Sequence, residues 1–222
     1  MTYFTPDFLH FFAELTENND RDWFNANKSR YDNSVKKPFE KLVADLIDRL
    51  QAIHPSMAIT PKDAIFRIYR DTRFSADKTP YKNHTSAIFA PGGKKDFQSP
   101  GMYLEMNNEH TRIYSGVYMP DKEVLQRIRE AIASEPARFR SLIEAPAFKE
   151  SYGEIRGDKN KRLPSEFVEA AATEPLLYNK AFYYFHQFPP ETALHDDLAE
   201  LIIAAYLKAK PVSDFLAEAM RG

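Results

Sequence analysis

The sequence predicts an α+β fold, in which N-terminal and C-terminal helices pack on an antiparallel sheet of four to five strands. Apolar residues recur every three or four positions in the first and last parts of the chain, as in helices with one buried face. In the middle of the chain, apolar and polar residues alternate, as they do in strands. With 222 residues, 43 % of them hydrophobic and 28 % charged, the chain can bury one sizeable core. We therefore expect a single α+β domain over residues 1–222.

Three helices are expected in the first quarter of the chain. Thr5 and Pro6 can start the first helix, because they place a cap residue before a proline in the first turn. The run Asn18, Asn19 and Asp20 breaks the first helix and can cap the second, and Pro38 can open the third. The third helix has a charged face opposite an apolar stripe made of Phe39, Leu42, Val43, Leu46, Ile47, Leu50 and Ile53. Such a helix is expected to pack with one side only.

The strands are expected in the middle of the chain, separated by Pro, Gly, Asn and Asp residues. A plausible hairpin connection at 107–110 joins the last two of the closely spaced strands, so an antiparallel meander is the natural arrangement. An aromatic-rich extended segment further along the chain is the candidate fifth strand. The expected strands cover 64–71, 84–90, 102–107, 111–118 and 182–188.

Helical spacing returns after the strands. Asp121 can cap one helix, and Pro136 can lie in the first turn of the next. Residues 153–164 are expected to form an exposed loop that ends in a basic cluster. Thr192 can cap a long final helix, which Pro211 is expected to separate from a short terminal helix.

Composition excludes several classes of function. The chain has no cysteine, which rules out disulfides, thiolate catalysis and cysteine-ligated metals. Its six histidines show no spacing of four residues from one another, so we expect no zinc site, no other metal and no cofactor. No apolar run is long enough to cross a bilayer, and the N-terminus lacks the features of a signal peptide. We expect a cytoplasmic protein without a membrane partner.

The most unusual stretch of the chain is 67–81. Its fifteen residues hold three arginines, one lysine, two aspartates and three aromatic rings. Over the slightly longer range 62–82 there are six cations and three anions, a surplus of three positive charges in a chain whose net charge is −2. The basic surplus therefore coincides with this motif, and such a density of forked donors is typical of a preorganised polar site.

Alternation assigns side chains to the two faces of the sheet. Each strand has one apolar face and one face of tyrosines and charged residues. Arg70 falls on the side of the apolar Phe66 and Ile68, where a guanidinium requires a carboxylate or a ligand as partner. The polar face is either a ligand-binding floor or a solvated surface with cross-strand ion pairs. Its residues are Arg67, Tyr69, Asp71, Tyr103, Glu105, Arg112, Tyr114 and Tyr118.

Two interpretations of the motif follow. In the first, Arg67, Arg70, Arg73 and Lys78 converge on one anion, and Asp71 and Asp77 orient the arginines or serve as a general base. Tyr81 completes that set of ligand-binding residues, together with Tyr103 and Glu105 on a neighbouring strand. In the second interpretation, the same charges form an ion-pair network that pins the loop 72–83 to the sheet and does no chemistry.

Other motifs give weaker indications. His84 follows the stretch directly and could act as an acid, a base or a ligand, although a single histidine at a strand start is more often structural. No serine has a G-x-S-x-G context, which argues against a serine hydrolase. Residues 92–95 are a basic turn and lack the P-loop pattern. Nucleic-acid binding through 62–82 and 92–95 is less favoured at a net charge of −2.

The stretch also carries a family resemblance. The chain resembles a mainly bacterial family of uncharacterised proteins with the pattern R-x-x-R-D-x-R-F-x-x-[DN]-K-x-x-Y. The similarity spans nearly the whole chain, and it implies no catalytic residue because the family is known as a domain of unknown function. The residues that carry it are Arg67, Arg70, Asp71, Arg73, Phe74, Asp77, Lys78 and Tyr81, with Asn19, Arg21, Trp23, Phe24, Lys28 and Tyr31 before them and Gly116, Tyr118 and Pro120 after them.

The sequence thus favours binding of a small anionic ligand that bears a phosphate or a carboxylate, and it leaves open whether the protein is an enzyme. The alternative is a non-catalytic protein-interaction module in which the motif is a structural ion-pair clasp. The sequence indicates no oligomeric state.

Overall fold

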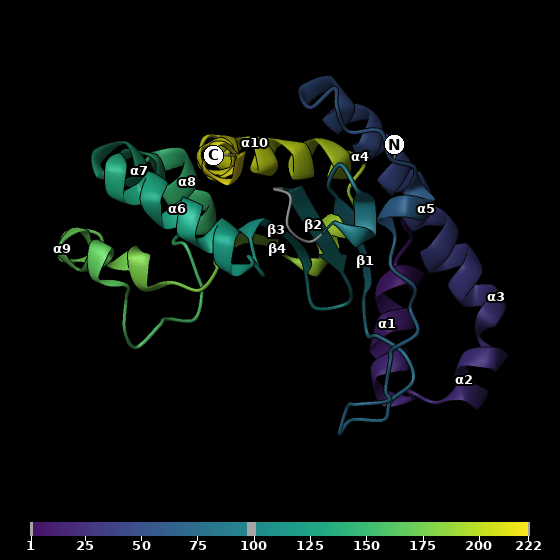
Figure 1. Ribbon diagram of the computed structural model, residues 1–222. Coiled ribbons are helices and arrows are strands. Elements are labelled where there is room, and N and C mark those ends of the chain that lie inside the picture. Colours follow the sequence, from purple (N-terminus) through teal and green to yellow (C-terminus); the bar gives the residue numbers. More distant parts are fainter. Residues whose placement is uncertain (1, 97–100, 222) are drawn as a thin grey trace. The chain divides into compact units, whose positions relative to one another are not determined.

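The computed structural model describes residues 2–96 and 101–221 (Figure 1). Within those residues, four strands form one antiparallel sheet in the order β1-β2-β3-β4. The strands are β1 (Thr85–Phe89), β2 (Gly101–Met106), β3 (Thr111–Val117) and β4 (Phe182–Phe188). Helices from both ends of the chain pack on this sheet, so the predicted α+β class is confirmed.

The chain divides into two compact units. Unit 1 comprises Met1–Lys94, Tyr103–Ile113 and Gln187–Ile203, and unit 2 comprises Lys95–Met102, Tyr114–His186 and Ala204–Gly222. The sheet and the last helix contribute residues to both units. The division into two units does not test the prediction of one domain over residues 1–222, which stays a prediction.

The helices of unit 1 begin largely where the sequence predicts. The carboxylate of Asp20 accepts hydrogen bonds from the backbone N–H groups of Asp22 and Trp23, which caps the second helix as expected. The ring of Trp23 lies 5.6 Å from that of Phe11 in the first helix. The helices are α1 (Asp7–Glu17), α2 (Arg21–Ala26), α3 (Lys28–Tyr31), the π-helical turn η1 (Asp32–Lys36), α4 (Lys37–Ile53) and α5 (Pro61–Ala64).

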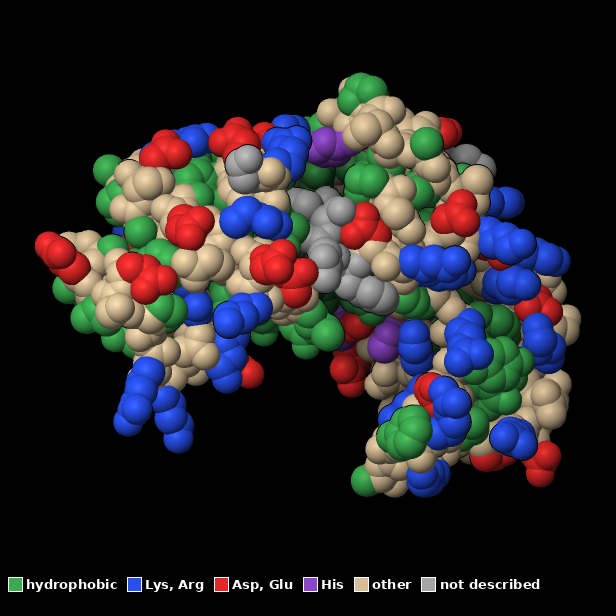
Figure 2. Space-filling model, viewed as in Figure 1, with side chains coloured by type: hydrophobic (Ala, Val, Ile, Leu, Met, Phe, Trp, Pro, Cys, Tyr) green, Lys and Arg blue, Asp and Glu red, His purple; other side chains and the backbone are tan. Residues whose placement is uncertain are grey.

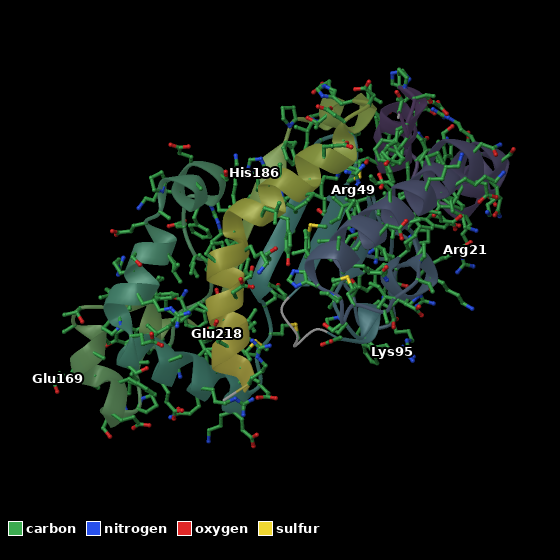
Figure 3. The ribbon with its side chains drawn as sticks, turned by 90° about the horizontal axis from the view of Figure 1, so that it is seen from above. Arg21, Arg49, Lys95, Glu169, His186 and Glu218 are labelled. Atoms are coloured by element: carbon green, nitrogen blue, oxygen red, sulfur yellow. The ribbon has the colours of Figure 1, made fainter. Side chains whose placement is uncertain are left out.

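Helix α4 provides much of the core of unit 1. Six residues of its predicted stripe, from Phe39 to Leu50, are buried, and the helix contacts β1. Its first turn continues from η1 with Pro38 near the start, as the sequence predicts. At its other end, Arg49 Nη2 pairs with Glu200 Oε1 at 2.7 Å, close to the start of the last helix (Figure 3). Burial of the apolar stripe is the dominant stabilising contribution of this helix.

The prediction of a strand at 64–71 is wrong. Thr60 and Asp63 form a reciprocal capping box, which stabilises the short helix α5 up to Ala64. The residues after α5 are extended but make only isolated bridges, between Ile65 and Ala87 and between Tyr69 and Tyr81. We call 65–70 the edge segment and 71–79, which connects it to the returning chain, the motif loop.

Unit 2 begins with a capped helix. Asp121 Oδ1 accepts the backbone N–H of Val124 at 2.8 Å, and Pro136 starts the following helix, both as predicted. Residues 153–164 form a loop whose Lys159, Lys161 and Arg162 are exposed, also as predicted. The helices are α6 (Lys122–Ser134), α7 (Pro136–Ile143), α8 (Pro146–Tyr152) and α9 (Val168–Ala171), with 3-10 turns at Ser165–Phe167 and Pro175–Tyr178.

Two predictions about the last helix are wrong. Thr192 lies in a separate 3-10 turn (Pro190–Leu194), and helix α10 runs without interruption over Leu198–Arg221 with Pro211 inside it. Tertiary contacts offset the hydrogen bond that the proline removes. In unit 2, the buried hydroxyls of Tyr184 in β4 and Ser213 in α10 lie 2.6 Å apart, and Phe215 is buried just beyond.

The predicted alternation is confirmed in β2 and β3, whereas in β1 four of the five residues are buried. Met102, Leu104 and Met106 of β2 are buried, while Tyr103 and Glu105 between them are partly exposed. The same pattern holds in β3. Near its end, Gly116 has φ +94°, and a Cβ atom there would lie 2.2 Å from the carbonyl oxygen of Phe182 in β4. The close approach of these two backbones therefore requires a glycine.

No helix in the described ranges is both long and apolar enough to span a membrane.

Candidate functional site

Ion pairs join residues of the motif loop to one another and to Arg70, the last residue of the edge segment. Arg73 donates two hydrogen bonds to the carboxylate of Asp71, from Nη2 to Oδ2 at 2.7 Å and from Nε to Oδ1 at 3.0 Å. Arg70 donates from Nη1 to Asp77 and lies against the hydroxyl of Thr79. These four charged side chains are therefore paired with one another.

The two aspartates of the loop are strongly acidic. The hydrogen bond from the side chain of Arg73 lowers the pKa of Asp71 to about 2. The backbone N–H of Thr79, followed by the side chain of Arg70, lowers the pKa of Asp77 to about 2. A carboxylate with so low a pKa is a weak base near neutral pH. Both residues therefore suit the orienting role better than that of a general base.

The guanidinium groups of Arg67, Arg70 and Arg73 do not meet at one point. Arg67 and Arg70 line two different hollows. Arg73 is mostly exposed on the loop, with 77 % of its side chain accessible. Lys78 donates a hydrogen bond from Nζ to the carbonyl oxygen of Thr72 at 2.8 Å, so it stabilises the conformation of the motif loop.

The larger hollow, which we call the basic hollow, lies in unit 1 and has a volume of about 640 Å³. Cations and rings from α3, η1, α4, α5 and the edge segment line it, and Glu40 is the one carboxylate among its lining residues in the described part of the chain. Figure 2 shows Lys and Arg side chains around a patch of hydrophobic side chains in this region of the surface. The lining residues are Lys28, Tyr31, Lys36, Phe39, Glu40, Pro61, Lys62, Ile65, Phe66, Arg67, Ile68, Tyr69, Thr85 and Lys94.

Two of the five cations in the basic hollow already have protein partners. Lys28 Nζ pairs with Asp32 Oδ1 at 2.8 Å. Lys94 Nζ donates to the carbonyl oxygen of Lys62 at 2.6 Å, near the end of α5.

The other three cations are Lys36, Lys62 and Arg67. Their side chains make no hydrogen bond or ion pair to any residue in 2–96 or 101–221. These three side chains are therefore available to an anion from outside the protein.

A smaller hollow lies on the other side of Tyr69, and we call it the tyrosine hollow. Its volume is about 280 Å³, and it also belongs to unit 1. Predicted site residues Arg70 and Tyr81 line it. The full lining is Arg21, Asn25, Tyr69, Arg70, Thr72, Pro80 and Tyr81.

Tyr81 has a mainly structural role. It is only 4 % exposed, and its ring stacks on Phe24 with the centroids 4.0 Å apart. Burial raises the pKa of its hydroxyl. Its ring therefore forms a fixed part of the wall of the tyrosine hollow, and its hydroxyl is not suited to donate or accept a proton near neutral pH.

Glu105 is the centre of a histidine cluster. Its carboxylate lies 3.0 Å from His110 Nε2 and 3.6 Å from His84 Nε2, and it accepts the hydroxyl of Tyr103 at 3.2 Å. Burial opposes its ionisation, but the hydrogen bond from His110 and the nearby His84 hold the pKa of Glu105 below its usual value. Burial also lowers the pKa of His84. Across 2–96 and 101–221, no group of three His, Asp or Glu side chains is placed to hold a metal ion.

Sequence reasoning missed the role of His110 and most of the basic hollow. The turn at 107–110 was predicted, and it folds His110 back toward Glu105, so the hairpin itself was the available signal. Lys28 and Lys94 appear in the sequence only within the family pattern and the basic turn 92–95, and nothing in the spacing brings them together with Lys36, because Lys94 lies far along the chain from the other two. The polar residues Tyr114 and Tyr118 belong to unit 2, where their rings meet Phe185 and Tyr183.

Residues 7–215 match the model of a family described as conserved hypothetical protein (DUF2461). The chain belongs to this family. Membership in DUF2461 confirms the resemblance to an uncharacterised family. No curated protein and no solved structure matches the chain significantly. Because the description of DUF2461 names neither a ligand nor a reaction, the function has to be inferred from the site itself.

Proposed function

We propose that the protein binds a small anionic ligand, bearing a phosphate or a carboxylate, in the basic hollow. The observation that carries the proposal is that the side chains of Lys36, Lys62 and Arg67 line one cavity and make no hydrogen bond or ion pair with the described residues. Cations gathered in a concave site attract an anion more strongly than the same charges spread over a convex surface. Arg67 supplies a two-pronged donor that suits either anion.

The walls of the basic hollow suggest the rest of the ligand. Tyr31, Phe39, Phe66 and Tyr69 present rings and apolar edges beside the cations. Pockets for small molecules commonly combine apolar walls with a few polar groups that fix orientation. We therefore expect a ligand with an apolar or planar part next to its charged group, in preference to a bare inorganic ion.

The histidine cluster is the candidate for proton transfer if the ligand is a substrate. The ring of Phe66, which lines the basic hollow, lies 6.0 Å from that of Tyr103, and Tyr103 bonds to Glu105. A histidine held by a carboxylate is a common general base. In this proposal His84 takes the role that the sequence had suggested for Asp71 or Asp77.

Isothermal titration at low ionic strength tests the proposal, with inorganic phosphate, citrate and adenosine 5′-monophosphate as probes. Arg67→Ala and Lys36→Ala should each weaken binding about tenfold, in line with the loss of one charge-assisted contact. Lys41→Ala is the matched control, because Lys41 is an exposed lysine of α4 outside the hollow. If none of the probes binds, or if all three variants bind equally well, the proposal fails.

The second candidate function is a protein-interaction module. It is favoured by the ion pairs of the motif loop and by Phe74, whose side chain at the loop is 95 % exposed. A protein partner would cover Phe74, with the clasp keeping the loop in shape. Phe74→Ser would then abolish capture of that partner while leaving anion titrations unchanged, whereas Arg67→Ala would do the reverse.

A further inference from the structure

The basic hollow and the tyrosine hollow share one wall residue. Tyr69 lines both cavities, and the residue is 48 % exposed. Its ring is steadied by Phe24 and Tyr81, whose centroids lie 6.2 and 5.3 Å away. A half-exposed and supported tyrosine ring between two cation-lined cavities is a natural stacking platform for a flat group.

The order of residues along the edge segment accounts for this arrangement. Arg67 lines the basic hollow and Arg70 lines the tyrosine hollow, and Tyr69 lies between them in the chain. The bridge between Tyr69 and Tyr81 fixes the register of the segment against the returning chain. The edge segment thus contributes Arg67 to the basic hollow, Arg70 to the tyrosine hollow, and the ring of Tyr69 to the wall of both.

The tyrosine hollow has its own available cation. Arg70 is engaged with Asp77, but Arg21 makes no hydrogen bond or ion pair to any residue of the described ranges. Figure 3 shows Arg21 on the outer side of the N-terminal helices. Asn25, one turn further along α2, adds an amide donor, and no carboxylate is among the described lining residues. This cavity therefore also favours an anionic group.

We propose that the ligand spans both hollows, with a planar ring on Tyr69 and two phosphate groups on the sugar that carries the ring, one at Arg67, Lys36 and Lys62 and the other at Arg21. This is the chemistry of a nucleoside 3′,5′-bisphosphate, and equally of a nucleotide inside a single strand. The inference rests on the proposed anion site in the basic hollow and extends it by a second anion subsite and a stacking platform.

Titration of adenosine 3′,5′-bisphosphate and adenosine 5′-monophosphate at low ionic strength tests the inference. The bisphosphate should bind about tenfold more tightly, since it gains a second charge-assisted contact. Arg21→Gln should remove that advantage and leave the affinity for the monophosphate unchanged. Tyr69→Leu should weaken both nucleotides about tenfold or more through lost stacking, but leave inorganic phosphate unaffected. Lys41→Ala is the control, and thermal melts check that each variant is folded.

The outcomes separate the two proposals. Equal binding of the two nucleotides, with no effect of Arg21→Gln, overturns the second subsite and leaves the basic hollow as an anion site. Binding of no anion at all overturns both. A short oligothymidylate distinguishes the sources of the ligand. Tighter binding of the oligonucleotide than of the bisphosphate supports a single strand as the natural ligand, and weaker binding supports a free nucleotide.

Discussion

The side-chain amide of Asn19 pairs with both backbone polar groups of Tyr81. Asn19 Nδ2 donates to the carbonyl oxygen of Tyr81 at 3.0 Å, and Asn19 Oδ1 accepts the backbone N–H of Tyr81 at 3.1 Å. The amide thus takes the place of a neighbouring strand and ties the entrance of α2 to the end of the family motif. The wall of the tyrosine hollow depends on this contact, because Tyr81 is one of its lining residues.

Replacement of Asn19 should destabilise the protein through this contact. Asn19→Ala removes both hydrogen bonds, so we expect the free energy of unfolding to fall by about 1–3 kcal/mol. Urea denaturation followed by circular dichroism measures the change. Asn33→Ala is the control, because Asn33 is an exposed asparagine of η1. An equal loss in both variants would argue against the pairing.

Gly116 should tolerate no side chain. Gly116→Ala combines an unfavourable φ with a clash against the carbonyl of Phe182, so we expect a loss of at least about 2 kcal/mol or failure to fold. Gly153→Ala is a matched control, because Gly153 has φ +74° but its Cβ would meet no atom within 4 Å. That variant should lose only about 1 kcal/mol. Chemical denaturation compares the two, and similar losses would disprove the clash.

The His84 side chain should make the protein less stable in mild acid. Burial lowers the pKa of His84 below its ordinary 6.5 in the folded state, so the unfolded chain binds more protons as the pH falls through this value. Stability therefore decreases from pH 7.5 to pH 5.5. His84→Gln should flatten that part of the profile. An unchanged slope in the variant would assign the pH dependence to other groups.

A second loss of stability is expected at lower pH, and it involves the motif loop. The pKa of Asp77 is lowered from 3.8 to about 2, so its stabilising contribution is present above about pH 4 and is lost between these values as the acid protonates it. Asp77→Asn should reduce the acid sensitivity in this range only. Because the side chain is solvent-exposed, salt should weaken the effect as well. Thermal melts between pH 5 and pH 2 provide the measurement.

The sequence predicted the architecture well where local rules decide it. Caps at Asp20 and Asp121 and the stripe of α4 all appear as expected, because short-range hydrogen bonds and apolar spacing determine them. The break predicted at Pro211 is absent, because packing of the neighbouring residues of α10 outweighs the local cost of the proline.

The site was less predictable than the fold. The local charge density predicted an anion site within 67–81. In the structure, the charges of Arg70 and Arg73 are paired with aspartates of the same stretch. Arg67 lines the basic hollow together with Lys62, which belongs to the same basic stretch 62–82, and with Lys36 from η1. The position of Lys36 beside the other two depends on tertiary structure, so spacing along the chain carries no signal for it.

Trp23 in α2 packs against Phe11 in α1 and is the sole tryptophan of the sequence. Its intrinsic fluorescence is therefore a built-in reporter for unit 1, placed two residues from both Arg21 and Asn25. Loss of that emission signal on heating follows unit 1, whereas far-ultraviolet dichroism follows the helices of both units. If the two signals change at one temperature, units 1 and 2 unfold cooperatively. If they change at different temperatures, each unit has a stability of its own.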